Sequence, residues 1–322
     1  MKKILKSIIN RYKIIFDLSG IIIFGLSAFN LKMYKLLGVK NLKYSTKLIK
    51  FIGIFPIRDH YYEPQFKNEY LRSKIKKPIK NLRIFNEKKI NNNFFKKFKF
   101  SKELVDLKLN QKNKLTLFNM NNPFFSNGDA DFLYQFIRYT KPKNIIEIGS
   151  GYSTLISYEA VLKNKQEKKN CSITCIDPGD IKIIRNLNIK RLKKKVEECD
   201  ESFFKSLKKN DLLLIDSTHI IKPFGDVLKI YQEIIPSLNK GVNICIHDIF
   251  IPYSYPSDWI IDHNLFWNEQ YLLEVLLMKT ETYKIEAPLF YMSKKYFSKL
   301  KKVCPYLKKN SKPSSFYLKK IN

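Results

Sequence analysis

Carboxylates and histidines gather in two short stretches of this sequence, each of which follows an apolar run. The stretch DLLLIDSTH places Asp216 and His219 after one run, and VNICIHDIF places His247 and Asp248 after another. The chain has only four histidines, so composition alone does not explain two of them here. Carboxylates with an imidazole can hold a divalent cation, and a histidine can accept a proton near neutral pH. These four residues are therefore the predicted catalytic residues.

Two interpretations of this cluster stay open. In the first, Asp216, His247 and Asp248 are ligands of a divalent metal that lowers the pKa of a bound hydroxyl. In the second, the same side chains form a hydrogen-bonded polar rim without a metal.

A glycine turn between an apolar run and a helical pattern forms a second candidate site. In NIIEIGSGYSTLI, the turn Gly149-Ser150-Gly151 lets the backbone approach a ligand closely, beside the unpaired N–H groups of a helix start. Thr154 stands where a dinucleotide-binding fingerprint has its third glycine, and Glu147 would repel a phosphate. The turn, together with Tyr152, is predicted to bind a cationic nucleoside, and an ordinary strand-to-helix turn is the alternative.

Two further acids follow the next predicted strands. Asp177, in CIDPGD, can accept hydrogen bonds from ribose hydroxyls, or it can form a turn before Pro178. Glu197, after the third strand, can reach an adenine amine, although acids in such places are usually solvated. Both are predicted cofactor-binding residues.

As a series, these motifs resemble the bacterial class I methyltransferases known as the methyltransferase domain 24 family. The motifs are IIEIGSGYSTL, CIDP, NDLLLIDSTH, KPFGDV, GVNICIHDIFIPYSYPSDW and FWNEQYLLEVLL, and the similarity covers roughly residues 120–292. The resemblance implies a Rossmann-like fold with S-adenosylmethionine as methyl donor, held by Glu147, the glycine turn and Asp177. It does not name an acceptor.

A more distant resemblance, to catechol-type O-methyltransferases, concerns the metal. In those enzymes the fourth strand ends in an Asp ligand with a lysine base three residues on, and the fifth ends in an Asp-Asn pair. Here Asp216 matches the first ligand, His219 stands at the lysine position, and His247-Asp248 replaces Asp-Asn. The resemblance implies His219 or His247 as base, while a nitrogen ligand would favour a transition metal over magnesium.

Alternation of strand and helix patterns positions these residues. Apolar strand patterns are predicted at 144–148, 172–176, 191–196, 211–215 and 242–247, with helical patterns between most of them and a further strand-like segment at 283–292. This alternation predicts an α/β fold with a Rossmann-like, doubly wound and mostly parallel sheet. Ligands of such sheets bind beyond the carboxyl ends of the strands.

Composition divides the chain into three predicted regions. Residues 1–100 form a basic, mainly helical N-terminal extension, which includes FPIRDHYYEP and a lysine-rich segment; residues 101–292 form the methyltransferase domain; residues 293–322 form a basic, solvated tail. The apolar stretch 14–29 contains Asp17 and is short for a membrane span. Peripheral contact with anionic lipid is the expected membrane interaction.

The net charge of +31 raises the possibility of a nucleic-acid partner, but only seven of the 60 basic residues are Arg, which specific readout usually uses. Five cysteines without a CxxC pair indicate a reducing, cytoplasmic compartment, with the inner face of the membrane as a possible site of contact.

The sequence thus predicts a methyltransferase that uses S-adenosylmethionine, with or without a divalent metal, to methylate an oxygen of a small-molecule or glycan-like acceptor. Two alternatives remain. One is a nucleic-acid-binding or nucleic-acid-modifying protein, and the other is a membrane-peripheral scaffold that binds S-adenosylmethionine without catalysis.

Overall fold

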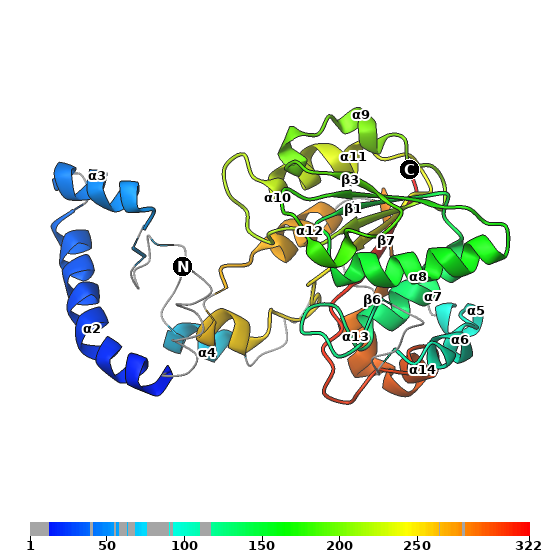
Figure 1. Ribbon diagram of the computed structural model, residues 1–322, viewed down its shortest axis with the longest axis horizontal. Helices are drawn as coiled ribbons and strands as arrows, with labels where there is room; N and C mark the ends of the chain where they lie inside the picture. The colour runs from blue at the N-terminus through cyan, green and yellow to red at the C-terminus, as the bar shows by residue number, and fades with distance from the viewer. Residues whose placement is uncertain are drawn as a thin grey trace. The chain divides into compact units, whose positions relative to one another are not determined.

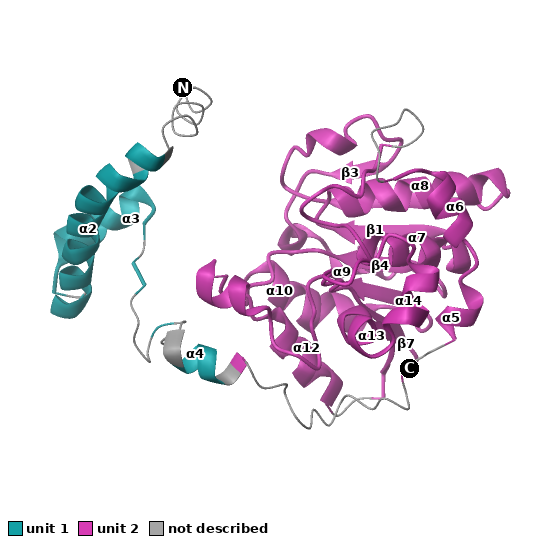
Figure 2. Ribbon diagram, turned by 90° about the horizontal axis from the view of Figure 1, so that it is seen from below, with its two compact units in different colours: residues 1–74 teal, residues 75–322 magenta. Residues whose placement is uncertain are grey.

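The computed structural model describes residues 13–38, 41–54, 56–57, 63, 68–75, 90, 93–109, 117–263, 265–278 and 281–322. It divides into two compact units, Met1–Lys74 and Ile75–Asn322, which Figure 2 draws in different colours. Of the stretch FPIRDHYYEP only residues 56–57 and 63 are described, and of the lysine-rich segment after it residues 68–75, 90 and 93–99.

A seven-stranded sheet forms the middle of the second unit (Figure 1). Its order is β3-β2-β1-β4-β5-β7-β6; the first five strands are parallel, and β7 is antiparallel to both of its neighbours. The strands are β1 (Asn144–Ile148), β2 (Ser172–Ile176), β3 (Lys190–Leu192), β4 (Leu212–Ile215), β5 (Asn243–Ile246), β6 (Tyr283–Pro288) and β7 (Phe316–Lys320). The predicted doubly wound, mostly parallel sheet is confirmed.

The central strands are apolar because both faces of the sheet are covered. All four residues of β4 and all four of β5 are buried, as expected for parallel strands enclosed by helices. Figure 1 shows α7 and α8 on one face and α9, α10 and α11 on the other. The chain order reverses between β1 and β4, so the crevice at their carboxyl ends is the place where such folds bind ligands.

Each helical layer has its own buried apolar cluster. The layer of α7 includes α5 (Phe94–Lys97), α6 (Ser101–Asp106), α7 (Asp129–Thr140), α8 (Tyr152–Gln166), α13 (Leu289–Lys295) and α14 (Phe297–Val303). The layer of α10 includes α9 (Glu201–Phe204), α10 (Asp226–Lys229), η4 (Ile230–Ile234), α11 (Ile235–Ser237) and α12 (Glu269–Met278). Short turns η2 (Lys182–Ile184), η3 (Val196–Glu198) and η5 (Asp258–Asp262) connect other elements.

The C-terminal residues correct one prediction. The region 293–322 is not a solvated tail, because it contains α14 and then β7, which lies between β5 and β6. Tyr317 packs against Phe132 and Phe136 of α7, with ring centroids 4.9 Å apart in each pair. The many lysines of region 293–322 led to the prediction that it is exposed to solvent. The short apolar run Phe316–Leu318 is nevertheless buried in the sheet.

Other boundaries also differ from the predicted ones. The second unit includes residues before 101, since Phe94 and Phe98 belong to its buried cluster and contact Phe132. The third strand is shorter than predicted and ends at Leu192. The segment 283–292 changes from strand to helix after Pro288, where α13 begins.

The described part of the first unit is helical, which confirms a helical N-terminal segment. Its helices are α2 (Lys13–Leu37), α3 (Lys43–Ile52) and α4 (Asn68–Ile75), the last of which ends at the boundary between the units. Within α2, Asp17–Leu37 is long and apolar enough to cross a membrane. The helix is longer than the predicted apolar stretch because it continues through Lys32 and Lys35.

The burial of β7 predicts a large effect of Leu318→Ala. This side chain is fully buried, and a Leu→Ala change in a core costs about 2–5 kcal/mol. Val275→Ala, at a position that is 64% exposed, is the control and should stay within about 0.5 kcal/mol of the parent. Urea unfolding measures both, and equal midpoints would contradict the placement of β7 inside the sheet.

Candidate active site

The register of the parallel strands places four predicted site residues along one edge of the sheet. The backbone ladder continues one residue past the strands: Gly149 donates its N–H to β2, Asp216 to β1 and His247 to β4, each at 2.9 Å. Asp177 donates to Leu192 of β3 at 3.1 Å. The carboxyl edge on both sides of the switch point is therefore lined by residues whose backbone positions the sheet determines.

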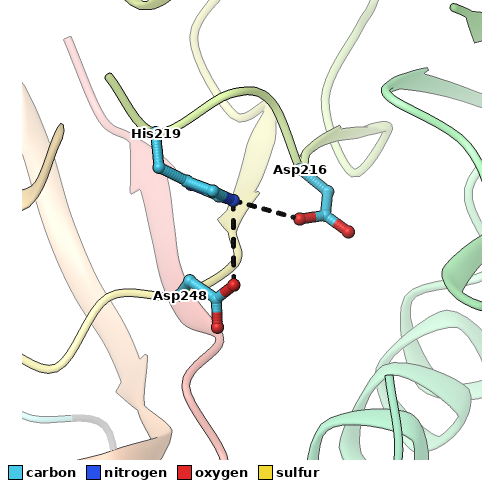
Figure 3. A group of neighbouring side chains, drawn as sticks. All are labelled: Asp216, His219 and Asp248. Atoms are coloured by element: carbon cyan, nitrogen blue, oxygen red, sulfur yellow. Dashed lines mark ion pairs between the residues drawn. The ribbon is translucent and has the colours of Figure 1, made fainter. Parts of the chain in front are cut away.

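The four predicted catalytic residues lie together at this edge. Figure 3 shows His219 pointing its Nε2 atom toward Asp216 and Asp248, at 3.4 Å and 3.7 Å. His247 presents Nδ1 to the same two carboxylates, at 3.3 Å from Asp216 and 3.4 Å from Asp248. Each carboxylate is thus shared between two imidazoles.

Two further carboxylates complete this charged cluster, and the sequence analysis did not assign either of them. Glu269, fully buried at the start of α12, lies 2.7 Å from Nδ1 of His219 through its Oε2 atom. Asp129, the first residue of α7, lies 3.9 Å from Nε2 of His247. An acid in a first helical turn is ordinarily explained by the helix dipole, so the sequence signal for both was ambiguous.

Ser314 is also part of the site, and it comes from the region predicted as a tail. Its hydroxyl donates to Asp248 at 2.8 Å and lies 3.4 Å from Nε2 of His247. The backbone N–H groups of Ser314 and Ser315 donate to the carboxylate of Asp129 at 3.0 Å and 2.7 Å. The segment before β7 therefore fixes one side of the cluster.

Backbone strain is present in the cluster itself. His219 and Asp248 have φ values of +60° and +57°, a region that non-glycine residues seldom adopt. The carbonyl of His219 accepts hydrogen bonds from the N–H groups of Asn268 and Glu269, at 2.9 Å and 3.2 Å. These bonds hold a conformation that by itself costs about 1–3 kcal/mol.

The carboxylates strongly favour the protonated imidazoles. Burial lowers the pKa of His219, but hydrogen bonds to Asp216 and Glu269 and the charges of Glu269 and Asp248 outweigh it, so that this pKa lies at about 10. Burial likewise disfavours a charged His247, yet Asp248 and Asp216 raise its pKa well above the ordinary value. Burial raises the pKa of Asp216, but His247 and His219 lower it more, to well below its usual range.

The same atoms are a candidate metal site. Among the described residues, Asp216, His219 and Asp248 form a group whose ligand atoms all lie within 4.8 Å of one another. Two carboxylates and one imidazole suit a divalent transition metal. The group differs from the predicted ligand set in that His219 stands in place of His247.

A cavity of about 520 Å³ opens at the switch point, beside Asp216. Of the predicted cofactor-binding residues, Gly149, Asp177 and Glu197 line it. Gly149 has φ +84°, and a Cβ there would lie 2.1 Å from the carbonyl oxygen of Asp216, so glycine is required. Asp177 also lines a neighbouring cavity of about 250 Å³ together with Ser150, whose hydroxyl donates to it at 2.9 Å.

Glu147 occupies a different place from the one predicted. It is fully buried and accepts hydrogen bonds from the hydroxyls of Ser153 at 2.5 Å and Thr154 at 2.7 Å, so it lies beneath the glycine turn and not on the cavity wall. Burial raises the pKa of Glu147 to about 7, against lowering by the bonds from Ser153 and Thr154. Glu147 therefore fastens the first turn of α8 to β1.

A second cavity, of about 310 Å³, borders the cluster at Asp129, His247 and Asp248. Its walls combine charged, hydroxyl and aromatic groups: Pro123, Phe124, Ser126, Asn127, Asp129, His247, Asp248, Trp259, Lys308, Asn310, Ser311, Lys312 and Ser314. Tyr152, a predicted cofactor-binding residue, stacks on Phe124 with centroids 6.0 Å apart, on the side of this second cavity. At Gly151, in contrast to Gly149, an added Cβ atom would meet no other atom within 4 Å, so close packing does not require a glycine there.

The buried carboxyl group of Glu147 predicts a pH-dependent effect of Glu147→Gln. Its folded pKa of about 7 exceeds the ordinary 4.5, so its stabilising contribution is present below pH 4.5 and is lost as the pH rises through 7. The glutamine variant lacks this loss, and relative to wild type it should gain about 3 kcal/mol between pH 4.5 and 8. Urea unfolding across this range measures the difference, and a constant difference would contradict the assignment.

The Glu269 contact predicts a lower pKa for His219 in Glu269→Gln, because the protonated imidazole loses a negative partner at 2.7 Å. With only four histidines in the chain, NMR titration of labelled imidazoles in the presence of a chelator can follow each one. Glu274→Gln, on the same helix, is the matched control. An unchanged His219 titration in Glu269→Gln would show that Glu269 does not stabilise the imidazolium.

One curated protein is similar in sequence to part of the chain. A curated relative, an uncharacterised protein of Archaeoglobus fulgidus, is 30% identical over 105 residues, which are 31% of this chain and 47% of the relative. The chain thus spans about half the length of the curated relative it matches.

Solved structures with a similar arrangement include two methyltransferases. The plantazolicin methyltransferase BpumL, in complex with SAH, is 17% identical, with 60% of this chain and 82% of that chain covered and a TM-score of 0.37. An O-methyltransferase from Bacillus cereus in complex with SAH is 12% identical, with 72% and 92% covered and a TM-score of 0.35.

The family model described as a methyltransferase domain, Methyltransf_24, matches residues 146–249. This span runs from β1 to the residue after Asp248, so it contains the glycine turn and the predicted catalytic residues. The resemblance drawn from the motifs is confirmed, and residues 146–249 belong to the methyltransferase domain family.

Proposed function

We propose that this protein transfers the methyl group of S-adenosylmethionine to an oxygen of a small, polar acceptor. The observation that carries the proposal is that two cavities border the same charged cluster. Asp216 lines the first cavity, His247 and Asp248 line the second, and only 3.3 Å separates Nδ1 of His247 from Oδ1 of Asp216. Two ligands held on the two sides would have their reacting groups near this contact.

The first cavity suits the donor. Asp177, at the end of β2, is placed to accept bonds from ribose hydroxyls, and Glu197 offers a carboxylate for the adenine amine. The carboxylate of Asp216 would lie near the positive sulfonium. The donor supplies the methyl group and leaves as S-adenosylhomocysteine, so the protein must align the two reactants, and correct positioning accounts for much of such a rate.

The second cavity suits the acceptor. Trp259 and Phe124 offer ring faces, while Asn127, Ser311 and Lys312 offer hydrogen-bonding groups, a combination that fits a hydroxylated ring such as that of a glycan-like compound. The proposed acceptor class is therefore a small polyhydroxylated molecule. Its reacting hydroxyl would face His247 and Asp248.

The base of the reaction is assigned to His247, because it lines the acceptor cavity. His219 is buried beside Glu269 and has its ring centroid 4.4 Å from that of Trp267. With their raised pKa values, His247 and His219 are both protonated at neutral pH, so His247 can accept a proton only when another cation compensates Asp216 and Asp248. A divalent metal held by Asp216, His219 and Asp248 would supply that compensation and lower the pKa of the acceptor hydroxyl.

Membrane contact, at the inner face of a membrane, is proposed for the basic N-terminal region. The nucleic-acid alternative is supported only by the net charge of +31.

Isothermal titration with S-adenosylhomocysteine tests the donor site. Asp177→Ala should weaken binding roughly 10- to 100-fold, since a hydrogen bond to a charged group contributes about 1.5–3 kcal/mol. Asp180→Ala, which removes a carboxylate from the wall of the smaller cavity, is the matched control and should bind like wild type. Absence of binding in wild-type protein, before and after chelation, would overturn the proposal.

A further inference from the structure

Helix α2 is apolar on every side, and its apolar side chains on every side are largely exposed. Ile21, Ile22, Ile23 and Phe24 are consecutive, so they point in directions about 100° apart, and each is 63–71% exposed. From Leu18 to Leu31 the helix carries no charged residue. A helix that is hydrophobic on all sides is stable either inside a protein core or inside a bilayer.

The next helix, α3, has two distinct faces. Tyr44, Leu48 and Phe51 recur at helical spacing on one face and are 89%, 59% and 89% exposed, whereas Lys43, Lys47 and Lys50 recur at the same spacing on the other. None of the residues of α3 is buried. A short, basic, amphipathic helix of this kind lies at the surface of an anionic membrane, with its apolar face among the acyl chains.

The two helices are held together at one end. The hydroxyls of Tyr34 in α2 and Thr46 in α3 are 2.8 Å apart, and Asn41 between the helices bonds to the carbonyl oxygens of Leu37 and Gly38. Lys32 lies near the C-terminal end of α2, where Lys35 pairs with Glu63 at 2.7 Å, so Lys32 and the lysines of α3 gather at the same end of α2. Lysines near the end of a membrane helix extend their charge to the interface.

We infer that α2 and α3 form a membrane anchor: α2 inserts into an anionic bilayer, and α3 lies on the surface at its C-terminal end. The uncharged part, Leu18–Leu31, would measure about 21 Å along its axis, and the whole of Asp17–Leu37 about 31 Å, against a hydrocarbon thickness of about 30 Å. Charge complementarity selects the lipid, because each lysine near an anionic surface adds favourable energy. This inference does not depend on the methyltransferase activity.

Flotation of the full-length protein with vesicles tests the anchor. The protein, purified in mild detergent and mixed with phosphatidylcholine/phosphatidylglycerol vesicles, should float with them and remain bound after high salt and alkaline carbonate. Ile22→Glu places a charge in the middle of the uncharged segment and should lower partitioning roughly 100-fold. Val275→Glu, at an apolar position of the second unit that is 64% exposed, is the matched control and should float like wild type.

The surface role of α3 has its own variant. Lys47→Glu/Lys50→Glu should reduce the preference for anionic over pure phosphatidylcholine vesicles and leave the carbonate-resistant fraction in place. Release of wild-type protein by salt alone, or equal flotation of Ile22→Glu, would overturn the insertion of α2. Failure to float, with a dimer in light scattering that Ile22→Glu converts to a monomer, would also overturn it and assign the α2 surface to a second copy of the chain.

Discussion

The candidate site depends on the balance of charge in a buried cluster of four carboxyl groups and two imidazoles. Asp216 and Asp248 each lie within 4 Å of both His219 and His247, so no single pair can be removed without leaving the other groups uncompensated. Breaking one partner of such a buried network typically costs several kcal/mol. The cluster is therefore both the proposed reactive centre and a structural element of the carboxyl edge of the sheet.

This balance links the metal question to the identity of the base. Carboxylates outnumber imidazoles, so the cluster favours a cation, which can be a proton on each imidazole, a divalent metal, or in part the sulfonium of the donor. An imidazole that holds a proton tightly is a poor base. For this reason the hypothesis of a metal-free polar rim and the hypothesis of a histidine base cannot both describe the active state at neutral pH.

Much of the fold and part of the site could be predicted from the sequence. The central strands β1, β2, β4 and β5 were recognisable because buried parallel strands are short apolar runs followed by glycine or acid. Since parallel strands end at the same edge, the grouping of Asp216, His219, His247 and Asp248 followed from chain order alone. The position of Glu147 beneath the glycine turn could not be predicted. Whether an acid at a strand end faces the cavity or the following helix depends on its partners, which here are the hydroxyls of Ser153 and Thr154.

Long-range parts of the site were the hardest to foresee. Glu269 and Ser314 reach the cluster from segments 50 and more residues away from their partners, and nothing in their local sequence indicates a partner. β7 was hidden because FYL is short and is followed by two lysines, and its assignment depends on the open edge of β5, which only tertiary structure creates.

The late position of β7 in the chain has a consequence for biosynthesis. When a ribosome has translated the chain only through β6, the outer edge of β5 has no partner, β6 has no strand to pair with, and Ser314 is not yet available to Asp248 and His247. Such a nascent chain has the β3-β2-β1-β4-β5 half with its glycine turn, but it lacks Ser314 on the proposed acceptor side. Premature termination before β7 would thus yield products with an exposed strand edge, which are prone to aggregation.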